Sequence, residues 1–246
     1  MRISIVKNRI ILIISLVFAS GSYVQSQTTD SLKNKKLLIR SIVPVTFIAS
    51  GLIINNSEFE KQLQKDIQNN LGNDFHNSLD DYTQYVPIAE MYIADLMGVK
   101  SKNHWFDQTK YLFISNLISA LITHGLKETV YKTRPDGTEN NSFPSGHSSF
   151  AFTNATVLFY EFNNSSPLLA YSGYAFATTT ATFRVLNNKH WVSDVLMGAG
   201  IGILVTNLVY YFEPLKSFNP FINSDKFTLV PVMDRGKYGA YFSYQF

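Results

Sequence analysis

Four apolar segments that carry almost no charged residues constrain the fold of this chain more than any other feature. Each is about 16 to 18 residues long, the short end of the length with which a helix crosses a bilayer. The segments are 111–126, 147–162, 168–183 and 195–212. Two further apolar stretches, 37–54 and 85–99, precede them. Segments of this length and composition predict an all-α fold, a helical bundle of about five to six apolar helices.

The overall composition favours a bundle that is embedded in a membrane. Only 16% of the residues are charged, against about 25% in a typical soluble protein. The net charge of +3 comes without any long run of Lys or Arg, so nucleic acid is not expected as a partner. The chain has no cysteine, which excludes disulfides, thiolate metal sites and cysteine nucleophiles.

The ends of the chain differ from the apolar middle. Residues 1–26 have a basic start, an apolar run at 10–19 and a small, polar end, the pattern of a signal peptide that directs export, with an uncleaved anchor as the alternative. Residues 27–81 are expected to form an N-terminal helix and a polar interfacial segment. Residues 215–246 contain two strand-like stretches around the turn 234–237, which predicts a short C-terminal β-hairpin.

Polar residues gather in three clusters, at 127–135, 143–149 and 184–194. If each apolar segment crosses the membrane, these clusters emerge on one face and the 161–167 loop on the other. The positive-inside rule does not assign the faces, since the 161–167 loop has no basic residue. The order of the segments therefore predicts a single site at one membrane face.

Each cluster has a plausible chemistry and an ordinary structural explanation. His190 and Asp194 are four apart, so on a helix the carboxylate could hold one imidazole nitrogen and leave the other free to attack. Ser145 and Gly146 precede an apolar helix, where backbone N–H groups can bind an anion. A helix cap or a surface ion pair would explain each cluster alone. Their occurrence together, in a chain poor in charge, points to a site.

The three clusters together resemble the signature of a known family. Lys127-X6-Arg134-Pro135, Pro144-Ser145-Gly146-His147 and Arg184-X5-His190-X3-Asp194 match, in order and spacing, the motifs of the type 2 phosphatidic acid phosphatases, which bacterial class A acid phosphatases and vanadium haloperoxidases share. The resemblance covers residues 82–214, the expected catalytic domain. It departs at Phe183, where the family usually has a serine, so one hydroxyl is missing from the edge of the site.

The resemblance implies a metal-independent phosphatase without a cofactor. It assigns His190 as the nucleophile that forms a phosphohistidine, Asp194 as the residue that orients it, and His147 as the acid and then the base. The groups that it assigns to the phosphate oxygens are Lys127, Arg134, Ser145, Gly146 and Arg184. Fixed cations and helix-start donors can compensate the charge of a transferring phosphoryl group as metal ions do elsewhere.

The expected protein is a phosphoric monoester hydrolase that acts on a lipid or isoprenoid phosphate, or an acid anhydride hydrolase if the substrate is a diphosphate. Its partners would be that substrate and the membrane. Its active site would face the periplasm, at the inner membrane or alternatively at the outer membrane. The alternatives are a soluble exported acid phosphatase with the same site, a vanadium haloperoxidase, and a non-enzymatic membrane protein with a relic site.

Overall fold

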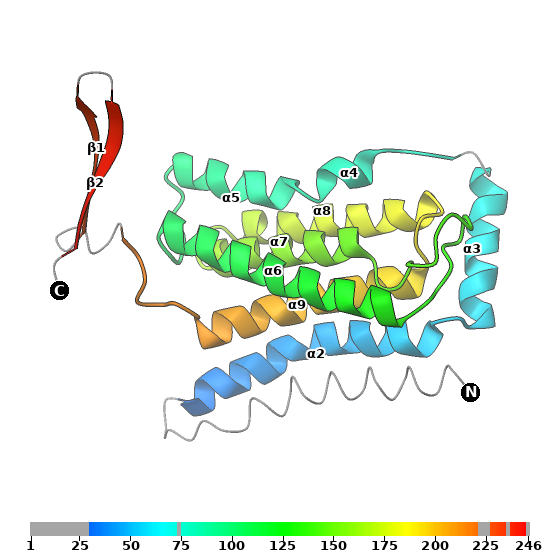
Figure 1. Cartoon of the computed structure of the whole chain (residues 1–246). Helices are drawn as coiled ribbons and strands as arrows, with labels where there is room; N and C mark the ends of the chain where they lie inside the picture. Colours follow the sequence, from blue (N-terminus) through cyan, green and yellow to red (C-terminus); the bar gives the residue numbers. More distant parts are fainter. Residues whose placement is uncertain (1–29, 73–74, 221–226, 235–236, 245–246) are drawn as a thin grey trace.

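A computed structural model describes residues 30–72, 75–220, 227–234 and 237–244, and its body is helical (Figure 1). The helices are α2 Asp30–Ile54, α3 Glu58–Leu71, α4 Leu79–Thr83, α5 Val86–Leu96, α6 Trp105–Thr129, α7 Gly146–Phe162, α8 Pro167–Leu186 and α9 Val192–Phe212. The predicted all-α bundle is confirmed. The described part contains eight helices rather than five or six, because the polar segment before residue 85 adds α3 and the five-residue α4.

The apolar segments pack around α9, which contacts α2, α6 and α7. Helix α7 lies between α6, α8 and α9, and α3 lies across one end of the bundle (Figure 1). The largest fully buried apolar side chains are Phe143, Phe162, Met91, Leu158 and Met197. The core therefore runs along α7 and α9, the helices that carry the second and third polar clusters.

Helices α2 and α9 approach each other closely at Gly200. A Cβ atom there would lie 2.8 Å from the carbonyl oxygen of Pro44 on α2, so a larger residue would push the helices apart. Pro44 has no N–H, which leaves the carbonyl of Arg40 without its helical donor. The side-chain amide of Asn207 on α9 donates to this carbonyl at 3.1 Å. The proline is therefore accommodated within α2 through a contact from α9.

The outer surface of the bundle is apolar on several helices. Helix α2 exposes Leu38 (70%), Ile42 (62%) and Ile53 (77%), while Phe113 of α6 and Leu168 of α8 are also exposed. Two helical segments, Ser31–Ile54 and Val192–Phe212, are long and apolar enough to cross a membrane. The second is mostly buried inside the bundle and the first is not. An apolar outer face is unusual for a protein surrounded by water.

The C-terminal region contains strands β1 Phe227–Asp234 and β2 Lys237–Tyr244. They pair antiparallel, with Phe227 opposite Tyr244 and Asp234 opposite Lys237. The centre of the predicted turn, residues 235–236, and the predicted leader, residues 1–26, lie outside the described residues. The domain boundaries at 26, 81 and 214 stay predictions.

Candidate active site

The three polar clusters meet at the end of the bundle where α6 and α8 finish and α7 and α9 begin (Figure 1). Helices α6 to α9 alternate in direction, so every second connection returns to the same end. The 161–167 loop follows α7 at the opposite end. The three clusters therefore lie at the same end of the bundle, and their place at one membrane face stays a prediction.

His190 and Asp194 form a buried pair at the start of α9. The imidazole is 2% exposed, and its Nδ1 lies 3.5 Å from Oδ2 of Asp194. His190 precedes the first residue of α9, Val192, so the two residues do not share a helical face as the sequence suggested. Instead, Asp194 accepts the backbone N–H of Trp191 at 2.9 Å, and this cap turns its carboxylate back toward the imidazole.

Burial lowers the pKa of His190 to about 4, and the charges of Arg184 and Lys127 contribute in the same direction. The hydrogen bond and charge of Asp194 act in the opposite direction but do not restore the usual value. The imidazole is therefore neutral at physiological pH. With Nδ1 facing the carboxylate, a neutral ring leaves the lone pair on Nε2.

A buried network that the sequence did not reveal holds Asp194. The ammonium of Lys132, which is 4% exposed, lies 2.9 Å from Oδ1 of Asp194 and 3.0 Å from Glu60 on α3. Ser142 donates to Oδ2 of Asp194, and Lys132 donates to the hydroxyl of Ser193 at 2.6 Å. Two carboxylates thus share one ammonium. The only signal in the sequence was the position of Lys132 between Lys127 and Arg134, and nothing pointed to Glu60.

The three cations predicted to bind phosphate lie close enough to influence each other. Burial, together with the charges of Arg134 and Arg184, lowers the pKa of Lys127 to about 8, while the charges of Asp194 and Glu139 act in the opposite direction. The Nε atoms of both arginines are buried and have no hydrogen-bond partner within the described part of the chain. The cluster therefore keeps donors that an anionic ligand could use.

Helix α4, which the sequence analysis missed, supplies carboxylates to two predicted site residues. Asp80 pairs with Arg184 at 2.8 Å, and Asp81 lies 3.5 Å from Nε2 of His147. Asp80 is 2% exposed, whereas the His147 side chain is 34% exposed. Arg184 is thus held firmly, while His147 stands nearer the open side of the site.

The start of α7 is fixed beside the start of α9 through Ser145. Ser145 is the N-cap, and its hydroxyl accepts the N–H of Ser148 at 3.4 Å. Its own N–H donates to the carbonyl of Asp194 at 2.9 Å, which fixes the start of α7 beside that of α9. A Cβ atom at Gly146 would meet no atom within 4 Å, so space is open above the first turn of the helix.

The 130–145 loop is tied to the third cluster. Trp191 donates through its indole N–H to the carbonyl of Thr133 at 2.8 Å, and Lys189 pairs with Asp136 at 2.8 Å. These contacts hold the loop that carries Lys132 and Arg134 against the third cluster. The hydrogen bond of Trp191 therefore holds this loop in place, a role that the sequence did not indicate.

A cavity of about 370 Å³ opens between α6 and α7 and leads to the site. Its lining residues are Asn116, Ser119, Ala120, Thr123, His124, Lys127, Gly146, Ser149 and Phe150. On α6 these residues recur every three or four positions, so they form one face of the helix. The cavity therefore joins the flank of the bundle to two of the predicted phosphate-binding residues.

Within the described ranges, no group of three or more His, Asp and Glu side chains is arranged to hold a metal ion. The prediction that the site works without a metal or cofactor stays a prediction.

Fold and site together define a helical-bundle protein with a cluster of cationic residues and histidines at one end. Residues 108–217 match the model of the PAP2 superfamily. The part of the chain that carries the three motifs is thus similar to the PAP2 superfamily.

Individual proteins are also similar to this chain. The chain is 35% identical over 150 residues to a lipid A 1-phosphatase of Porphyromonas gingivalis, which covers 59% of this chain and 33% of that protein. It thus spans about a third of the length of this curated relative. Two crystal structures are similar at 20% identity. LpxE of Aquifex aeolicus has a TM-score of 0.44, with 62% of this chain and 93% of that chain covered. A transmembrane PAP2-type phosphatidylglycerolphosphate phosphatase of Bacillus subtilis has a TM-score of 0.49, with 73% and 98% covered.

Proposed function

We propose that this protein is a lipid phosphate phosphatase that works through a phosphohistidine intermediate. The observation that carries the proposal is the neutral, buried His190, which is held by Asp194 and lies near the cations Lys127 and Arg184. The match of residues 108–217 to the PAP2 superfamily supports the reaction type. The apolar outer surface and the cavity on the flank of the bundle support a lipid substrate.

In the proposed reaction, Nε2 of His190 attacks phosphorus while the bond to the leaving oxygen breaks. His147 gives its proton to that oxygen. Asp194 stabilises the charge that develops on the imidazole, and Lys127, Arg134, Arg184 and the first turn of α7 bind the non-bridging oxygens. Water then attacks the phosphohistidine, His147 takes its proton, and phosphate leaves with His190 restored.

The cavity between α6 and α7 is proposed to receive the part of the lipid next to its phosphate. It ends at Lys127 and Gly146, and Ser119, Thr123 and Ser149 line it with hydroxyl groups. A relative named lipid A 1-phosphatase makes lipid A the first substrate to test. Phosphatidic acid, phosphatidylglycerol phosphate and undecaprenyl diphosphate present a similar anion and complete the panel.

Phosphate release from this panel in EDTA, measured with purified protein in detergent, tests the proposed function. Turnover of at least one lipid phosphate without added metal is expected. Release from soluble phosphates alone would instead favour the exported acid phosphatase. A complete lack of release from any substrate would favour the non-enzymatic alternative.

Filling the cavity should separate lipid substrates from small ones. The variant Ala120→Trp places an indole in the cavity. For the best lipid, kcat/KM should fall by about tenfold or more, because a substrate displaced from its reactive position reacts much more slowly. Turnover of p-nitrophenyl phosphate should change by less than about threefold. Leu121→Trp is the matched control, since Leu121 is 65% exposed and does not line the cavity. An equal loss on both substrates would contradict this role of the cavity.

The pH profile should report three groups of the site. His190 must be neutral to attack, so kcat/KM should fall as the pH drops through about 4. His147 must carry a proton to act as the acid, and burial holds its pKa below the usual value, so kcat/KM should fall as the pH rises through the pKa of His147. Lys127, whose pKa is lowered to about 8, must be charged to bind phosphate and should add a second loss at higher pH. Lys127→Arg should keep activity and remove only this second loss, since arginine stays charged. An unchanged profile above about pH 8 in this variant would show that another group titrates there.

We further propose that the bundle is embedded in the inner membrane with its site facing the periplasm. The apolar outer faces of α2, α6 and α8 support embedding. Lys33, Lys35 and Lys36 lie at the start of α2, at the end of the bundle away from the site. Although the 161–167 loop does not assign the faces, the two ends of α2 differ, since residues 50–57 at its other end carry no basic residue. Basic residues beside a spanning helix favour the cytoplasmic side, which would leave the opposite end outside.

The absence of cysteine allows this orientation to be measured directly. Lys61→Cys marks the end of the bundle that carries the site, and Lys35→Cys marks the other end. An impermeant maleimide, added to cells with a permeabilised outer membrane, should label the first variant and reach the second only after lysis. The reverse pattern would place the site in the cytoplasm. The same reverse pattern would arise if a leader were cleaved on the periplasmic side of the membrane. Residue 30 would then lie in the periplasm, and α2 would cross the membrane toward the cytoplasm.

A further inference from the structure

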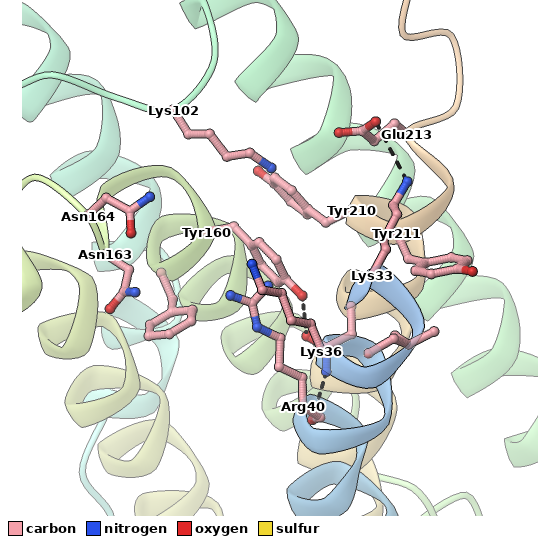
Figure 2. A pocket seen from close by; sticks show the side chains of 13 residues that line it. Lys33, Lys36, Arg40, Lys102, Tyr160, Asn163, Asn164, Tyr210, Tyr211 and Glu213 are labelled. Carbon is pink, nitrogen blue, oxygen red and sulfur yellow. Dashed lines mark hydrogen bonds and ion pairs between the residues drawn. The ribbon is translucent and has the colours of Figure 1, made fainter. Parts of the chain in front are cut away.

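A second cavity, of about 310 Å³, lies at the end of the bundle opposite the candidate active site (Figure 2). It is formed by the first turns of α2, the last turns of α7 and α9, and the connection before α6. Four of its lining residues are cations, namely Lys33, Lys36, Arg40 and Lys102. The proposed reaction uses none of them.

The positive charge of this cavity is not neutralised by its surroundings. Within the described part of the chain, Lys36, Arg40 and Lys102 have no carboxylate within ion-pair distance. Lys33 lies 4.0 Å from Glu213, which also pairs with Lys216 at 2.7 Å. Glu213 is the only acidic residue in the described lining. The cavity therefore carries a clear excess of positive charge.

Aromatic rings hold the cations in place. Tyr160 and Tyr210 are stacked, with their ring centroids 4.2 Å apart and nearly parallel. The guanidinium of Arg40 lies 4.5 Å from the ring of Tyr160, and the ammonium of Lys102 lies 5.2 Å from the ring of Tyr210 (Figure 2). Such contacts fix a cation without neutralising it. Its hydrogen-bond donors stay available to a ligand.

The wall behind the rings is fixed by buried hydrogen bonds. Tyr160 donates to Asn207 at 3.1 Å, and Asn207 donates to the carbonyl of Arg40. Tyr210 donates to Glu161, which also accepts two N–H groups of Asn103. The carboxylate of Glu161 is thus bound behind the ring of Tyr210. The cavity wall is preorganised, which lowers the cost of binding a ligand.

We propose that this cavity binds the phosphate group of an anionic phospholipid. Phosphate is the anion that clustered lysines and an arginine fit best. A lipid source is indicated because Leu37 and Phe159 also line the cavity, and Leu32 and Leu38 are exposed beside it on α2. Tyrosines and basic residues at the end of an apolar helix form a typical headgroup contact. A free phosphate has the same charge chemistry and is distinguished by the test.

The test compares two double variants with the same change in charge. Lys36→Ala/Lys102→Ala removes two cations from the cavity, whereas Lys35→Ala/Lys100→Ala removes exposed neighbours that do not line it. Arg40 is left in place because it packs on Tyr160. Retention of phosphatidylglycerol or phosphatidylcholine by the full-length protein is measured by native mass spectrometry in detergent. Binding of inorganic phosphate is measured by calorimetry, and thermal unfolding checks that both variants are folded.

Affinity for phosphatidylglycerol should fall by roughly twentyfold in the cavity variant, since each cation near a lipid surface contributes about a factor of five. It should stay within about twofold of the unaltered protein in the control variant. The candidate active site is intact in both, so lipid bound there cancels in the comparison. Equal retention by the two variants would overturn the proposal. Loss of inorganic phosphate binding alone, with phosphatidylglycerol unaffected, would overturn the lipid source.

Discussion

His190→Ala is expected to lower phosphate release by about four orders of magnitude or more, because removing a nucleophile eliminates the covalent route. His190 is 2% exposed and its Nδ1 faces Asp194, so no neighbouring side chain can replace Nε2. The rate is measured by phosphate release from the best lipid substrate. Alkaline quenching of the unaltered enzyme with a labelled substrate should trap phosphohistidine, and the variant should show none.

The control for this variant is His76→Ala, since His76 is exposed and distant in sequence from the three motifs. It should retain full activity. Thermal unfolding must show that His190→Ala is folded, because the lost ring leaves a cavity in the core. A folded His190→Ala protein that keeps more than about a tenth of the activity would exclude the phosphohistidine mechanism.

Lys132→Met is expected to lower the free energy of unfolding by about 3 kcal/mol or more and to abolish most activity. Lys132 lies 2.9 Å from Asp194 and 3.0 Å from Glu60, and all three residues are buried. Methionine fills similar space but leaves two buried carboxylates without a counterion, which is strongly destabilising. Thermal and denaturant unfolding in detergent measure the first effect, and kcat/KM measures the second.

A second substitution tests whether the loss of stability comes from the unpaired carboxylates or from the change in side-chain shape. Glu60→Gln in the Lys132→Met background removes one of the unpaired carboxylates, so part of the lost stability should return. Activity should stay low, because Asp194 still lacks the ammonium that positions it for His190. Lys61→Met is the matched control, since Lys61 forms only an exposed pair with Glu58. A Lys132→Met protein as stable as the control would show that the buried ion pairs do not hold the site.

The sequence alone determined the helical bundle and predicted which residues form the site. The long apolar segments predict α6 to α9 because their length and lack of charge leave few other ways to bury them. Lys127, Arg134, Ser145, His147, Arg184, His190 and Asp194 could be named because their identities and spacings are local. The order of the segments was enough to place them at one end.

Tertiary structure alone decided how those residues are held. Lys132 meets Glu60 across 72 positions of the chain, and Arg184 meets Asp80 across 104. Helix α4, which brings Asp80 and Asp81, has only five residues and no apolar periodicity. The cationic cavity joins the start of α2 to the ends of α7 and α9. Such partners leave no pattern in the sequence, because contacts over long separations depend on how the helices pack, and each motif is compatible with many packings.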